Sequence, residues 1–193
     1  MHFCVQVRTN SAGVCPEVGL ASLGTGLVHR PNVECLHRLL KKWNPIRLSF
    51  HGESMIGLMD GHFADLPRLC SLVEDFVEST SAVWAEFSED TVLAILDNAM
   101  RTRPECTVEV DVPLARFRTA EQIQLIVRKM EELSKLGLHA NVFLPVRIPF
   151  VRLFAAIFGP QHNHTLTTEA LQIRFGARKT VVLKLVSYLD TEQ

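Results

Sequence analysis

The chain has 193 residues, which exceeds the commonest domain length but is too short for two full domains, so we expect a single domain over residues 1–193. Its hydrophobic content of 47% and charged content of 21% are ordinary for a globular protein and exclude a disordered chain. The 20 Lys and Arg residues offset 21 Asp and Glu residues, and the net charge of −1 predicts no nucleic-acid partner and no attraction to anionic lipid.

Period-two alternation of apolar and polar side chains is the clearest pattern along the chain, and each instance predicts a half-buried strand. The first strand is followed by a Gly-rich connection over residues 11–27, which we expect to form a loop, and then by a helix. The predicted strands cover residues 3–7, 46–51, 83–87, 106–112 and 139–144.

Apolar residues at three-and-four spacing predict helices between the later strands. These helices begin at Asp65, at Ser88 or Glu89, and at Thr119. The last is the best defined, because Glu121 lies in its first turn and Gly137 stands where a left-handed C-terminal cap belongs. Its apolar stripe consists of Ile123, Ile126, Val127, Met130 and Leu133.

The chain closes with a predicted β-hairpin, formed by residues 171–175 and 180–186 around Gly176. Alternating strands and helices predict an α/β fold. Because each strand keeps one polar side, we expect largely one sheet with the helices packed on one face, and not a doubly wound sheet. An irregular arc like that of leucine-rich-repeat proteins is one form of such a sheet, although the ladder of Leu with Asn or Cys at fixed offsets is missing.

Cysteine usage and hydropathy indicate the cellular setting. The five cysteines are odd in number, scattered and never in a Cys-x-x-Cys pair, which disfavours a disulfide framework and a zinc site. Residues 1–8 lack the continuous apolar core of an export signal, and the apolar run from Phe150 to Phe158 is about half of the roughly 20 residues that span a bilayer. We therefore expect a soluble, intracellular, cytoplasmic protein without a membrane span.

Three segments resemble known motifs without matching them. Gly24-Thr25-Gly26 lacks the third glycine of a dinucleotide-binding loop. Residues 52–57 resemble a nucleophile elbow, but Ile56 stands where the second glycine is needed. His162 and His164 have the spacing of metal ligands yet lie in a polar turn where histidine is simply tolerated. We therefore predict no cofactor and no metal site.

The polar side of the predicted strands is the main candidate site. If the central strands are neighbours in register, this side gathers carboxylates, a histidine, an arginine and aromatic rings on one surface. The alternative, that these residues simply face water, has equal weight, although aromatic rings gain little from exposure. The candidate binding residues are Arg47, His51, Trp84, Glu86, Glu109, Asp111 and Phe143.

The apolar segment of residues 146–158 is a second candidate. If it is helical, Phe150, Phe154 and Phe158 form one row on its surface. So wide an apolar surface does not stay in water, and we expect the segment to dock into the core or onto a partner. Phe150 and Phe154 therefore join the candidate binding residues.

These features favour a non-catalytic interaction or scaffold protein. We expect it to bind another macromolecule, a protein, through the polar and aromatic sheet face or through residues 146–158. The alternative is a small metal- or carboxylate-dependent enzyme that uses His51, Glu86, Glu109 and Asp111 on the same face. Metal bound to the purified protein would favour the enzyme, whereas metal-free protein that associates with a partner would favour the scaffold.

Overall fold

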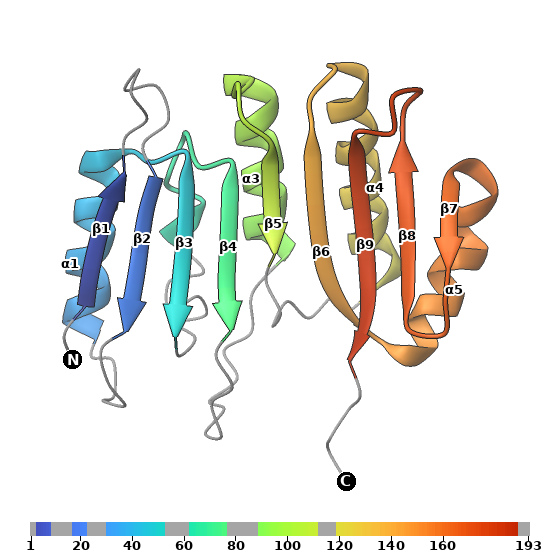
Figure 1. Ribbon diagram of the computed structural model, residues 1–193, viewed down its shortest axis with the longest axis horizontal. Coiled ribbons are helices and arrows are strands. Elements are labelled where there is room, and N and C mark those ends of the chain that lie inside the picture. The colour runs from blue at the N-terminus through green and yellow to red at the C-terminus, as the bar shows by residue number, and fades with distance from the viewer. Residues whose placement is uncertain are drawn as a thin grey trace, which may run out of the picture.

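The computed structural model describes residues 3–8, 17–22, 30–52, 62–76, 89–111 and 119–188. They form one sheet of nine strands in the order β1-β2-β3-β4-β5-β6-β9-β8-β7 (Figure 1). The strands are β1 Phe3–Arg8, β2 Glu17–Ser22, β3 Arg47–Gly52, β4 Ser71–Phe76, β5 Val108–Asp111, β6 Ala140–Arg147, β7 Asn163–Leu166, β8 Ala170–Phe175 and β9 Val181–Tyr188. The helices are α1 Arg30–Trp43, α3 Glu89–Thr102, α4 Ala120–Lys135 and α5 Ile148–Phe158.

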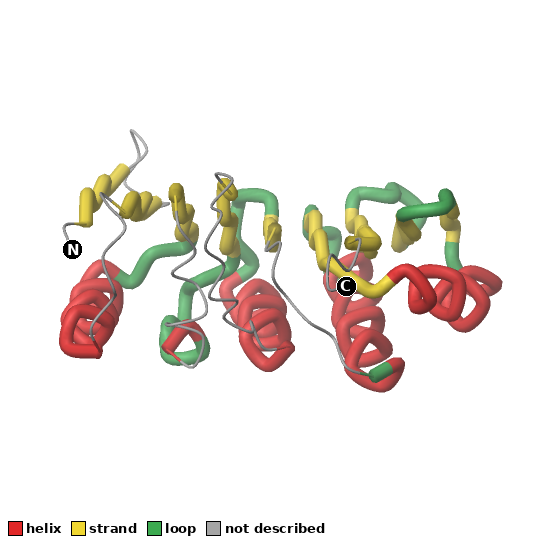
Figure 2. The backbone as a smooth tube through the Cα atoms, turned by 90° about the horizontal axis from the view of Figure 1, so that it is seen from below, coloured by secondary structure: helices red, strands yellow, loops and turns green. Residues whose placement is uncertain are grey.

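The middle of the sheet is parallel and its edges are antiparallel. Strands β2 to β6 follow one another in chain order, and β9 joins β6 in parallel. At the edges, β1 pairs with β2, β8 with β9, and β7 with β8, all antiparallel. Within the described residues, the helices lie on one face of the sheet, as Figure 2 shows. The predicted α/β class, with helices packed on one face and a C-terminal hairpin, is confirmed.

The core lies between the sheet and this helix layer. Alternate strand residues such as Leu48, Val110 and Leu183 are buried against the helices, which leaves their neighbours on the opposite face. The predicted stripe of α4 is buried along its full length. Thr119 closes a capping box with Gln122, and Gly137 adopts φ 75° after the helix, as expected of a left-handed cap.

Two segments in the N-terminal half differ from the sequence predictions. Residues 17–22 form strand β2 and not a loop: Val18 and Leu20 point into the core, but the alternating residues are Gly19 and Ala21, so the polar half of the pattern is missing. Residues 71–76 form strand β4 and not the second half of a helix.

The three-and-four spacing that begins at Asp65 correctly identifies buried residues, but the helix that it predicts does not form. Leu66 and Leu69 are both fully buried, yet they belong to turns that contain Pro67, which cannot donate to a continuing helix. The chain beyond them pairs with β3 and β5 on both sides, and this long-range pairing decides in favour of a strand. The strand predicted over residues 83–87 lies outside the described residues.

The C-terminal part agrees closely with its pattern. Strands β8 and β9 form the predicted hairpin, and Gly176 takes φ 72° at its turn. The polar turn around His164 contains one further short strand, β7, at the edge of the sheet. None of the described helices combines the length and the apolar character that crossing a bilayer requires.

Candidate functional site

The face of the sheet opposite the helices, called the open face below, presents side chains in aligned rows. Because strands β2 to β6 and β9 are parallel and in register, residues on neighbouring strands stand side by side. The first row consists of Glu17, Arg47, Ser71, Glu109, Asn141 and Val182. The second row consists of Gly19, Ser49, Val73, Asp111, Phe143 and Lys184.

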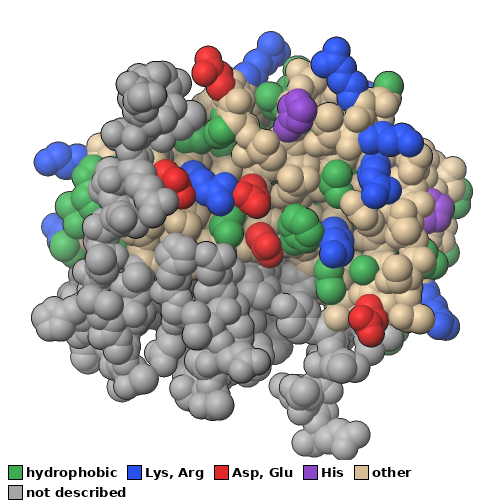
Figure 3. Space-filling model, in the orientation of Figure 1, with side chains coloured by type: hydrophobic (Ala, Val, Ile, Leu, Met, Phe, Trp, Pro, Cys, Tyr) green, Lys and Arg blue, Asp and Glu red, His purple; other side chains and the backbone are tan. Residues whose placement is uncertain are grey.

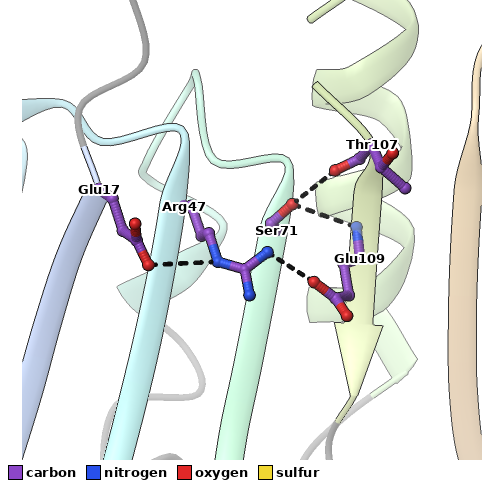
Figure 4. Close-up of polar contacts among 5 residues, drawn as sticks. All are labelled: Glu17, Arg47, Ser71, Thr107 and Glu109. Carbon is purple, nitrogen blue, oxygen red and sulfur yellow. Dashed lines mark hydrogen bonds and ion pairs between the residues drawn. The ribbon is translucent and has the colours of Figure 1, made fainter. Parts of the chain in front are cut away.

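An ion-pair bridge spans four strands of the first row (Figure 4). Arg47 Nη1 lies 2.5 Å from Glu109 Oε2, and Arg47 Nε lies 3.4 Å from Glu17 Oε1. The three side chains are each about one-third exposed, so water screens the pairs only in part. One guanidinium between two carboxylates leaves this part of the surface with a negative charge.

The small side chain of Ser71 makes the bridge possible. Ser71 stands on β4, between the strands of Arg47 and Glu109, and its size lets the guanidinium pass over it. Its Oγ accepts a hydrogen bond of 3.1 Å from the Glu109 N–H and donates one of 3.2 Å to the Thr107 carbonyl. Ser71 therefore also fixes the start of β5 against β4, and with it the backbone of Glu109.

The second row carries an acid, an aromatic ring and a base on adjacent strands. Asp111 on β5, Phe143 on β6 and Lys184 on β9 are all half-buried. Lys184 Nζ lies 5.6 Å from the centre of the Phe143 ring, a distance at which cation and ring attract each other. Figure 3 shows acidic and basic side chains next to hydrophobic ones on this face.

The predicted face residues are only partly within the described part of the chain. Arg47, Glu109, Asp111 and Phe143 share the open face. His51 belongs to β3, opposite Asp75 of β4, but its side chain is outside the described part. Trp84 and Glu86 also lie outside the described residues.

The two phenylalanines of the apolar segment lie on α5, in the helix layer. The Phe154 side chain is buried in the core, and its ring stacks on Phe150, which is half-buried. The outward side of α5 carries Leu153 and Ile157 instead. Phe154 therefore contributes to packing, away from the open face.

Sequence reasoning missed three polar members of the rows. Glu17 was assigned to a loop and Ser71 to a helix, so neither was placed on the sheet. Lys184 was assigned to the closing hairpin, whose position beside β6 depends on a long-range pairing. The position of Lys184 between the buried Leu183 and Leu185 was the signal for its side of the strand, although the same side otherwise carries Val182 and Val186.

A second polar cluster lies in the helix layer, between α1 and residues 62–65. His37 Nε2 is 3.6 Å from Asp65 Oδ2, and the rings of His37 and His62 have their centres 4.4 Å apart. Lys41 Nζ approaches the same carboxylate to 3.4 Å. Burial lowers the pKa of His37, and the neighbouring charges of His62 and Lys41 lower it further.

The histidines considered as metal ligands have other contacts. The His162 ring lies 5.0 Å from the Phe175 ring, and His162 Nε2 is 3.4 Å from Glu131 Oε1. His164 is exposed on β7. Within the described ranges, no three His, Cys, Asp or Glu side chains are arranged to hold a metal ion.

In comparisons of the whole chain with known proteins, no family model, no curated protein and no solved structure matches.

Proposed function

We propose that the protein is a non-catalytic interaction module that binds another protein across the open face of its sheet. The observation that carries this proposal is the row of Asp111, Phe143 and Lys184, in which a half-buried ring stands between an acidic and a basic side chain. Protein interfaces typically combine an aromatic anchor with charged residues that set orientation.

The chemistry of the row specifies what a partner must present. An apolar group that covers Phe143 removes its remaining exposed surface from water, which is worth about 25 cal/mol per Å². An acidic group fits beside Lys184, so this charge helps to fix the register of the bound chain. The Arg47 bridge holds the neighbouring strands in place without itself needing a partner.

The alternative of a carboxylate-dependent enzyme receives no support from the described geometry. Glu109 Oε2 is engaged by Arg47 at 2.5 Å, so this carboxylate is already paired. His51 and Glu86, the other groups that such a mechanism would use, have side chains outside the described part.

The test is quantitative capture of partners by variants of the full chain. Phe143→Ala removes the ring from the open face, whereas the control Leu153→Ala removes an apolar side chain that is 45% exposed on α5. The wild type and Leu153→Ala should capture the same proteins. These proteins should bind Phe143→Ala at least about tenfold more weakly, as expected for loss of a central anchor. Thermal unfolding checks that both variants are folded. Equal capture by all three folded proteins would overturn the proposal.

A further inference from the structure

We infer that the open face binds an acidic, extended segment of the partner protein, and that the hairpin of strands β8 and β9 holds this segment. The inference rests on the proposed function, because it names the chemistry of the partner at the same face. Residues 170–188, called the basic hairpin below, carry four cations and no acidic residue, in a chain whose net charge is −1. The four cations are Arg174, Arg178, Lys179 and Lys184.

The cations of the basic hairpin are not neutralised by the described part of the chain. In the helix layer, by comparison, Lys129 Nζ lies 2.5 Å from Asp97 Oδ1. Among the described residues, none of the four hairpin cations has an acidic partner: Arg174 donates a hydrogen bond of 3.3 Å to the Thr165 hydroxyl, and Lys184 approaches an aromatic ring. The basic hairpin therefore presents a positive charge that a partner can neutralise.

The open face is accessible around the basic hairpin. On strands β3 and β4, Ser49, Ser71 and Val73 are buried, and this part of the face offers a ligand little surface. From β6 to β7, every described side chain of the open face is half-buried or exposed, Phe143 and Val182 among them. Figure 3 shows basic side chains gathered over this part of the face.

The four cations follow the length of the hairpin. Arg174 and Lys184 stand on neighbouring strands, two positions out of register, so their Cα atoms are diagonal neighbours about 7–8 Å apart. Arg178 and Lys179 are exposed in the turn that joins the two strands. At about 3.3 Å per residue, the distance from Lys184 to this turn is roughly 15 Å, which an extended peptide of about five residues covers.

Apolar side chains between the cations specify the rest of the segment. Val182 and Val186 flank Lys184 on the same side of β9, and Phe143 stands beside Lys184 on β6. A segment in which acidic residues alternate with apolar ones can pair with the cations and cover these apolar side chains at the same time.

The same face is poorly suited to a nucleic acid. Sheets that bind single strands stack the bases on exposed aromatic rings, whereas the described side chains of this part of the face include a single ring, Phe143, which is half-buried. Glu17 and Glu109 share the guanidinium of Arg47, so the neighbouring part of the face is negative and repels phosphate groups. An acidic peptide segment that stays over the basic hairpin avoids this repulsion.

The experiment measures binding of fluorescein-labelled probes to the full chain by fluorescence anisotropy. The acidic probe is a peptide of about nine residues, long enough to span the hairpin, that alternates glutamate with alanine around one central leucine. One control peptide has glutamine in place of each glutamate, and an oligothymidylate of the same length tests for nucleic-acid binding. The acidic peptide should bind at least about tenfold more tightly than either control, and its binding should weaken as salt is added.

Charge-reversal variants locate the binding surface. The double variant Arg174→Glu, Lys184→Glu should bind the acidic peptide at least about tenfold more weakly than the wild type. Its matched control is Arg128→Glu, Arg152→Glu, which reverses two exposed cations of the helix layer, on α4 and α5, and should bind like the wild type. Thermal unfolding of both double variants shows whether the fold is retained.

Three results would overturn the inference: equal binding of the glutamate and glutamine peptides, equal binding by the two folded double variants, or binding of oligothymidylate as tight as that of the acidic peptide. The last result would identify the hairpin as a nucleic-acid site. If the acidic peptide does not bind while capture of another protein still depends on Phe143, the inference fails and the proposed interaction function stands.

Discussion

Phe154→Ala should remove a large part of the stability of the protein. The side chain is 2% exposed, and its ring stacks between Phe150 and Phe158, with centre-to-centre distances of 5.8 and 6.0 Å. Truncation of a buried Phe to Ala typically costs about 3–5 kcal/mol, of which each aromatic pair accounts for about 0.5–1.5 kcal/mol. We expect a loss of about 4 kcal/mol, because both stacked neighbours lose their contact.

Such a loss is readily measured by urea unfolding. Trp43 is partly buried against the core, and its fluorescence should report the transition. For a protein of this size, about 4 kcal/mol corresponds to a decrease of roughly 10 °C in Tm. Leu153→Ala, the neighbouring position on the outward side of α5, should cost less than about 1 kcal/mol. Equal losses from Phe154→Ala and Leu153→Ala would refute the packing of α5 described above.

Two further predictions concern single polar groups. Burial, together with the charges of His62 and Lys41, keeps the pKa of His37 below its ordinary value of 6.5. The unfolded chain therefore binds a proton more readily, and stability should fall as the pH decreases below about 6.5. His37→Gln should reduce this dependence of Tm on pH. Identical profiles of Tm against pH for the wild type and His37→Gln would contradict the prediction. Ser71→Ala leaves the Glu109 N–H without its side-chain acceptor and should cost about 1–3 kcal/mol in urea unfolding. Ser134→Ala, which loses only a local bond within α4, is the control, and an equal cost would contradict the role of Ser71.

Alternation predicted those strands whose two sides differ in polarity. It found β3 and β5, in which Leu48 and Val110 alternate with polar residues, and it missed β2, in which Gly19 takes the place of a polar residue. Strand β4 was missed because burial of Leu66 and Leu69 fits a helix as well as a turn, and only pairing with β3 and β5 separates the two.

The candidate site depended on the same distinction. Arg47 and Glu109 were assigned to one face from alternation alone, but their ion pair reaches across β4, so it could not be foreseen while residues 71–76 were taken as helix. Placement of Lys184 beside Phe143 requires β9 to insert between β6 and β8. Local pattern carries no information on such an insertion, because the paired residues are far apart in the chain.

The order of the strands has a consequence for folding. From β1 to β6, each strand pairs with its neighbour in the chain, so these contacts are comparatively local and can form progressively. Strand β9 is different, because it joins β6 only after α5, β7 and β8 have been passed. The acidic side of the open face can thus be in place before the basic side, which becomes complete only when residues 181–188 dock. During synthesis, a chain that still lacks β9 would expose the β6 edge, so the open face carries both its acidic and its basic side chains only once the sheet has closed on β9.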